Sequence, residues 1–111
     1  PAVYDLPLAA GYDYGGHVNN YFKTQDGIVH VEFCILRAGG IPFEDRVTFA
    51  TLPVGYRPPA QIVASVGGDG WDIGTNIIGM ELSVDPDGQM RIYRPSANVA
   101  WAFGSFSFLA S

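Results

Sequence analysis

The sequence has little sulfur, little histidine and little positive charge, and each shortage excludes a class of function. Its single cysteine, Cys34, excludes an intramolecular disulfide, and with only His17 and His30 beside it no zinc-type ligand spacing can be written. We therefore expect no metal and no other cofactor. Six Lys and Arg stand against eleven Asp and Glu, a formal net charge of -5, so a nucleic acid or an anionic membrane would be repelled.

Long hydrophobic runs and helical patterns are also missing. No apolar stretch approaches the roughly 18 residues of a membrane helix, and no basic segment followed by an apolar one opens the chain, so no membrane insertion is expected. Fourteen Gly and eight Pro are too many for long helices. The 111 residues, 48% of them hydrophobic, suffice for one domain with one core. Because the chain begins at Pro1, we expect a piece of something longer.

The sequence does contain short segments of alternating apolar residues, each closed by a turn signal, which is typical of strands. In residues 27–36, for example, Val29 and Val31 fall on one face, while His30 and Glu32 fall on the other. The predicted fold is all-β, an antiparallel β-sandwich or jelly-roll-like domain over residues 1–111, in which residues 1–20 form an entry segment or a loop. The predicted strands are 3–8 at an edge, 27–36, 46–51, 61–66, 77–84, 90–93 and 99–109.

Turn residues fix the connections between these strands. Asp85-Pro86-Asp87-Gly88 has the composition of a type I turn with a following bulge, so residues 77–94 are predicted to form a hairpin. Gly67 to Gly70 is predicted to be a loop, and the three prolines of residues 53–59 predict a rigid connector. Both faces of 99–109 are largely apolar, which predicts either an internal strand or a contact with another copy of the chain.

The residues that catalysis needs do not assemble into a recognisable pattern, and no enzyme is predicted. Most carboxylates fall in turns, and a glycosidase pair would have to come from strand residues such as Glu32 and Glu81. His30 and Glu32 share a strand face and could bind a sugar or, with a second copy, a metal; a solvated polar face is the simpler interpretation. The Asp85-x-Asp87-Gly88 segment lacks the glutamate of a calcium loop, since Arg94 takes its place.

A binding surface remains, because sugar recognition needs exposed aromatic rings and planar polar side chains on loops of a rigid scaffold. Aromatic residues of a small β domain also serve as core, and that alternative holds for each residue taken singly. The candidates lie in three groups, with Tyr12 and Asn20 beside the first and Arg94 and Asn98 beside the third: Tyr14, His17 and Asn19; Asp69, Trp71 and Asp72; Tyr93 and Trp101.

One segment resembles a known family. Leu52-Pro53-Val54-Gly55-Tyr56-Arg57-Pro58, which follows a strand and precedes the Asp87-Gly88 hairpin and a final Gly104-x-Phe106-x-Phe108 strand, resembles the distal receptor-binding domains of tailed-bacteriophage tail-fibre and baseplate proteins. The resemblance covers the chain from about Asn20 onward. It implies a β-sandwich or jelly-roll-like domain, the C-terminal part of a longer tail protein. It places the connector of residues 52–59 outside the sugar site.

The resemblance also implies a function. Such a domain is a non-catalytic host-recognition module of a phage or prophage, located extracellularly on the virion at the tail tip or baseplate. It binds bacterial cell-surface polysaccharide as a homotrimer and contacts other phage tail proteins. The alternative is a purely structural virion domain that trimerises or attaches a neighbouring tail protein. A third hypothesis is a fragment of a polysaccharide depolymerase, which is disfavoured because the sequence shows no catalytic pattern.

Overall fold

The computed structural model describes residues 1–42, 45–70, 77–93 and 99–110, and in these ranges the ordered elements are strands. The strand predicted over residues 3–8 is observed only as a two-residue strand. The first twenty residues contain two short strands and the start of a third. The nine strands are β1 (Tyr4–Asp5), β2 (Tyr12–Asp13), β3 (Asn20–Lys23), β4 (Ile28–Arg37), β5 (Arg46–Thr51), β6 (Ile62–Asp69), β7 (Ile78–Val84), β8 (Gln89–Tyr93) and β9 (Trp101–Leu109).

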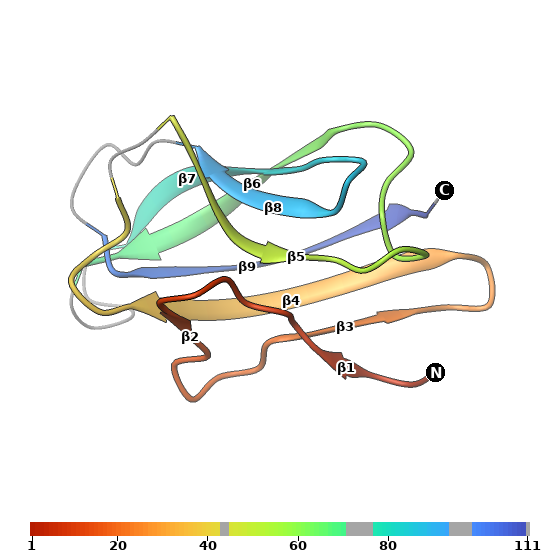
Figure 1. Ribbon diagram of the computed structural model, residues 1–111, viewed down its shortest axis with the longest axis horizontal. Coiled ribbons are helices and arrows are strands. Elements are labelled where there is room, and N and C mark those ends of the chain that lie inside the picture. The colour runs from red at the N-terminus through yellow and green to blue at the C-terminus, as the bar shows by residue number, and fades with distance from the viewer. Residues whose placement is uncertain (43–44, 71–76, 94–98, 111) are drawn as a thin grey trace.

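The strands form one antiparallel sheet in the order β1-β3-β4-β9-β6-β7-β8-β5, with β2 paired to β4. The sheet is strongly curled, and Figure 1 shows β6, β7 and β8 folded back over β9, β4 and β3. An isolated bridge between Leu8 and Ala50, flanked by a 2.8 Å bond from the Ala9 N–H to the Phe49 carbonyl, joins the segment after β1 to β5 at the other edge. The predicted all-β antiparallel fold is confirmed, and its two layers are halves of a single sheet.

The core lies between the two layers. The inward side chains of β4, including Val29, Val31 and Phe33, are buried as the alternating pattern predicted. Phe33 meets Phe49 of β5 with ring centroids 5.1 Å apart, so the two layers are joined by an aromatic contact. Burying side chains of this size on both layers supplies the main stabilisation of the fold.

Strand β5 departs from strict alternation. In the sequence, alternation places Val47, Phe49 and Thr51 on one face of the strand and Ala50 on the other. Val47 and Phe49 are buried, but Ala50 is buried too and Thr51 is exposed. The cause is a register shift between Thr48 and Ala50 in the pairing with β8. A bulge of this kind moves the following residues to the opposite face.

The prediction of a loop at Gly67 to Gly70 is wrong, because β6 continues through Asp69. Gly67 and Gly68 pair with Phe103 and Ala102 of β9. A Cβ added at Gly67 would lie 2.5 Å from the Phe103 ring, so the glycine makes room for that ring on the sheet surface. The glycines therefore serve close packing between strands and not a turn.

The predicted hairpin of residues 77–94 is confirmed over residues 78–93, where β7 pairs with β8. Its turn closes with a 2.8 Å bond from the Gly88 N–H to the Asp85 carbonyl, and Gly88 has φ of +89°, a value that only glycine adopts freely. The Gly88 carbonyl accepts a 2.9 Å bond from the Leu52 N–H, which ties the turn to the connector of residues 52–59. That connector contains no strand, as predicted, and it packs against the hairpin.

Strand β9 lies between β4 and β6 and is therefore an internal strand of the sheet. Its inward residue Ala102 is fully buried, whereas Leu109 near its end is 59% exposed. No helix that could cross a membrane occurs in the described ranges.

Candidate functional site

Most of the predicted binding residues that the structure describes lie at one end of the molecule, on strand ends and on the loop between β2 and β3. Figure 1 shows β4, β6 and β8 ending, and β9 beginning, at this end, whereas both chain termini lie at the opposite end. Trp101, the first residue of β9, stands opposite Leu36 of β4 and Asp69 of β6. The loop between β2 and β3 brings Tyr14, His17 and Asn19 to the same place. We call this group, Tyr14, His17, Asn19, Asp69 and Trp101, the loop-end cluster.

Trp101 and His17 form the aromatic part of the loop-end cluster. Their ring centroids are 5.9 Å apart and the rings meet edge to face at 78°. His17 is exposed and Trp101 is half-buried. The indole also lies against Gly15, where φ is +63° and where an added Cβ would collide with the ring. The loop can fold over the indole because residue 15 has no side chain.

Asn19 holds this loop to β4 from beneath. Its side chain is only 6% exposed. The side-chain amide donates to the carbonyls of Tyr14 at 2.8 Å, His17 at 3.1 Å and Cys34 at 2.9 Å, and its oxygen accepts a 2.8 Å bond from the Cys34 N–H. Strand β3 begins at Asn20 and does not extend alongside Cys34 of β4. The Asn19 amide therefore supplies the hydrogen bonds that a neighbouring strand would otherwise make with the Cys34 backbone. Its hydrogen-bonding capacity is occupied by the protein.

Tyr14 and Asp69 differ in exposure. Tyr14 is 42% exposed, and its hydroxyl donates a 2.8 Å bond to the Leu6 carbonyl, which fixes the ring on the surface. Asp69 is 1% exposed, and one of its carboxylate oxygens accepts a 2.7 Å bond from the Gly70 N–H. Tyr14 therefore offers a surface to a ligand, whereas Asp69 lies under the strand ends.

The remaining predicted residues lie apart from this cluster or outside the described ranges. Tyr93 ends β8 opposite Arg46 of β5, and its ring is 49% exposed. Figure 1 places the end of β8 at the same end of the molecule as the loop-end cluster. Trp71, Asp72, Arg94 and Asn98 lie outside the described residues.

A second feature is a groove on the outer face of β3, β4 and β9. One hollow of about 420 Å³ is lined by Asn20, Phe22, His30, Val31, Glu32, Ser105, Phe106 and Ser107. A second, of about 500 Å³, shares Glu32 and Ser105 with the first and continues to His17 and Phe103. The two hollows are therefore parts of one depression, which we call the outer groove. It reaches His17, a member of the loop-end cluster.

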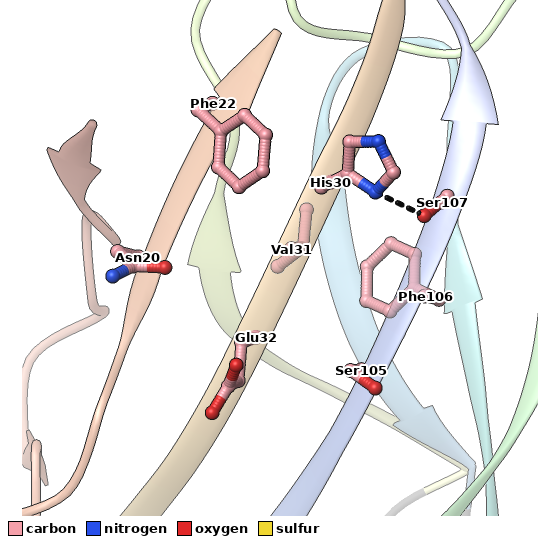
Figure 2. Close-up of a pocket in the computed structure, with 8 residues that line it drawn as sticks. All are labelled: Asn20, Phe22, His30, Val31, Glu32, Ser105, Phe106 and Ser107. Carbon is pink, nitrogen blue, oxygen red and sulfur yellow. Dashed lines mark hydrogen bonds between the residues drawn. The ribbon is translucent and has the colours of Figure 1, made fainter. Parts of the chain in front are cut away.

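Strand register explains how the outer groove forms. Phe22 stands opposite His30, and His30 opposite Ser107. The Phe22 and His30 rings stack with centroids 5.0 Å apart, and the His30 Nδ1 lies 2.7 Å from the Ser107 hydroxyl, as Figure 2 shows. The next row across the strands is Asn20, Glu32 and Ser105. Alternation in β4 correctly predicts that His30 and Glu32 share one face. Their neighbours on β3 and β9 are set by strand pairing, which the sequence alone does not show.

The described residues contain no group of three or more His, Cys, Asp or Glu side chains arranged to hold a metal ion. The two aspartates of the hairpin turn serve the turn itself. Asp85 pairs with Arg91 at 3.1 Å. Asp87 accepts bonds from the side-chain amide and the backbone N–H of Gln89, which hold the pKa of its carboxyl below the ordinary value.

Cys34 lies on the outer face of β4 and is buried as a free thiol. Burial raises the pKa of this thiol, so less thiolate is present at neutral pH than for an exposed cysteine. We expect a disulfide reagent to react with Cys34 at least about tenfold more slowly in the native protein than in the urea-unfolded chain. Colorimetric thiol titration measures both rates, and equal rates would contradict the burial of Cys34.

The comparisons with known proteins define a class of fold. No family model matches the sequence, and no curated protein sequence matches it. The structure has the fold of a phage receptor-binding head domain. One matching solved structure is the head domain of the lactococcal phage bIL170, a receptor-binding domain for which a fold common to lactococcal phages has been asked about. The TM-score is 0.75 and the identity 16%, over 99% of this chain and 98% of the other.

Proposed function

We propose that this protein is a non-catalytic host-recognition module of a phage or prophage tail, which binds bacterial cell-surface saccharide through Tyr93 and through Tyr14, His17 and Trp101 of the loop-end cluster. Asn19 holds the loop that carries Tyr14 and His17. The observation that carries the proposal is the match to a phage head domain over 99% of the chain. Tyr14 and Tyr93 support it, since both side chains are exposed and the chain segments that carry them lie at the end remote from the chain termini. In a tail protein, this end would be free to meet a cell surface.

The chemistry of the loop-end cluster suits a saccharide. An aromatic ring packs against the apolar face of a sugar ring, and a polar partner beside it binds the hydroxyls. Here the indole of Trp101, the imidazole of His17 and the exposed ring of Tyr14 supply such surfaces. Trp71 and Asp72, outside the described residues, belong to the same proposal by their position after β6. The net charge of -5 favours a neutral or cationic saccharide over an anionic one.

We further propose that the module acts as a homotrimer on the virion, at the tail tip or baseplate, in contact with other tail proteins. Binding of a single sugar site is weak, and joining three sites raises the apparent affinity without any new contact. The experiment that tests the saccharide proposal is binding of the purified protein to extracted surface polysaccharides, compared between wild type and site variants.

Replacing Tyr93 with alanine is expected to weaken polysaccharide binding about fivefold while leaving stability almost unchanged, because the ring is 49% exposed and packs little. Tyr4→Ala is the matched control, since Tyr4 is 44% exposed and β1 lies toward the opposite end of the molecule. Surface-plasmon resonance on immobilised polysaccharide gives both affinities. If both variants lose affinity for the polysaccharide to the same extent, Tyr93 is not part of the binding site.

A further inference from the structure

The outer groove combines two kinds of surface that a glycan needs. The stacked rings of Phe22 and His30 give it an aromatic wall at one end. Beside them lies a row of polar side chains, Asn20, Glu32 and Ser105, each on a different strand. Figure 2 shows this row crossing β3, β4 and β9 next to the ring pair.

The polar row is available to a ligand. Glu32 is exposed, and within the described ranges the side chains of Asn20, Glu32 and Ser105 donate or accept no hydrogen bond. The His30 and Ser107 side chains, by contrast, are bonded to each other. A carboxylate, an amide and a hydroxyl together accept and donate bonds to neighbouring hydroxyl groups, as vicinal sugar hydroxyls require.

The charge of the outer groove limits the ligand further. Among the described residues that line it, Glu32 is the one carboxylate, and none is Lys or Arg. An anionic group placed here would meet a carboxylate and no fixed positive charge. The ligand must therefore be uncharged or cationic, and rich in hydroxyl groups.

The length of the outer groove exceeds one sugar ring. His30, Glu32 and Cys34 are alternate residues of β4, and at the rise of a strand they span about 13 Å. The two hollows meet at Glu32 and Ser105, so a ligand that fills both passes over the polar row. At its far end the groove reaches His17, next to Trp101.

We propose that the outer groove is a second glycan-binding site, which holds a neutral or cationic stretch of more than one sugar along β4, with Glu32 as its central hydrogen-bond acceptor. The inference rests on the proposed function, because it assumes a surface glycan as ligand. It differs from that function in place, since the loop-end cluster binds at the strand ends and the outer groove on the sheet face, and the two have only His17 in common.

The test compares Glu32→Gln with Glu81→Gln in the full chain. Glu81 is a matched control, because it is an exposed glutamate of β7 that faces Ser65 on the neighbouring strand, as Glu32 faces Ser105. The probe is polysaccharide extracted from a bacterial strain that the wild-type protein binds, together with its fragments graded by length. We expect Glu32→Gln to weaken binding about tenfold and Glu81→Gln to change it less than about twofold.

Fragment length gives an independent readout. If the outer groove holds several sugars, affinity rises by about tenfold from a single sugar to a fragment that spans both hollows, and Glu32→Gln removes most of that rise. If Glu32→Gln and wild type bind equally well, the proposal of a glycan site in the outer groove is wrong. If Trp101→Ala still weakens binding in the same assay, the proposed function stands without a glycan site in the outer groove. If wild type binds no polysaccharide, both proposals fail.

A second copy of the chain is the competing occupant of the outer groove. Glu32→Arg places a long cationic side chain there, which a subunit contact would not accommodate. We expect the mass in light scattering to match that of wild type. A lower mass for Glu32→Arg would make the outer groove a subunit contact and would overturn the glycan site.

Discussion

Replacing Asn19 with alanine is expected to lower the free energy of unfolding by about 3 kcal/mol. The variant removes one accepted hydrogen bond and the contacts of the amide N–H groups with three carbonyls, from a residue that is 6% exposed. It leaves the Cys34 N–H and carbonyl without a partner inside the protein, and unsatisfied buried groups cost far more than the net gain of forming the bonds. Urea unfolding followed by circular dichroism measures the change.

Asn20→Ala is the matched control for this prediction. Asn20 is the next residue, half-buried, and its side chain makes no hydrogen bond within the described ranges. We expect Asn20→Ala to change the free energy of unfolding by less than about 0.5 kcal/mol. Similar stability of Asn19→Ala and Asn20→Ala would show that the amide of Asn19 does not organise the loop.

Replacing Trp101 with alanine is expected to weaken polysaccharide binding by at least about tenfold and to destabilise the protein by about 2 kcal/mol. The indole supports the loop of residues 14–18 through its contacts with Gly15 and the His17 ring. Its removal takes away both the proposed sugar platform and the support for His17. Affinity is measured at a temperature at which circular dichroism shows the variant to be folded.

Trp101→Phe separates the two effects. Phenylalanine keeps an aromatic surface at the start of β9 but is smaller, so part of the binding should return while the loop remains less well supported. We expect an affinity between those of wild type and Trp101→Ala. If the alanine variant binds as tightly as wild type while folded, Trp101 is not part of the site.

Local alternation made much of the fold predictable. In β4 a strict period of two residues separates the core side chains from His30 and Glu32, and the hairpin carries its turn in the order Asp85, Pro86, Asp87 and Gly88. Both features depend on residues close in sequence, and both are confirmed. The likeness to phage receptor-binding domains is confirmed at the level of the fold.

The errors arise where a distant strand decides the outcome. Gly67 and Gly68 look like a loop, but they form strand because the Phe103 ring and β9 occupy the space beside them. Thr51 is exposed because β5 bulges against β8, a pairing that its own sequence does not show. In both cases tertiary packing overrides the local signal.

The candidate site was predictable in composition but not in arrangement. The sequence identified Asn19 as a polar loop residue, and only the structure shows that its amide binds the backbone of β4. Likewise, the face shared by His30 and Glu32 was visible in the pattern of alternation. The Phe22 ring and the serines of β9 join it through strand register, which a single sequence does not reveal.

The most direct test of the central claim is binding of the labelled, purified protein to a panel of bacterial cells and their extracted surface polysaccharides, with the mass recorded by light scattering on the same sample. We expect a trimer that binds some strains saturably and is displaced by the polysaccharide of those strains. A confirmed trimer that binds no cells and no polysaccharide would contradict the claim and would favour a purely structural domain of the virion.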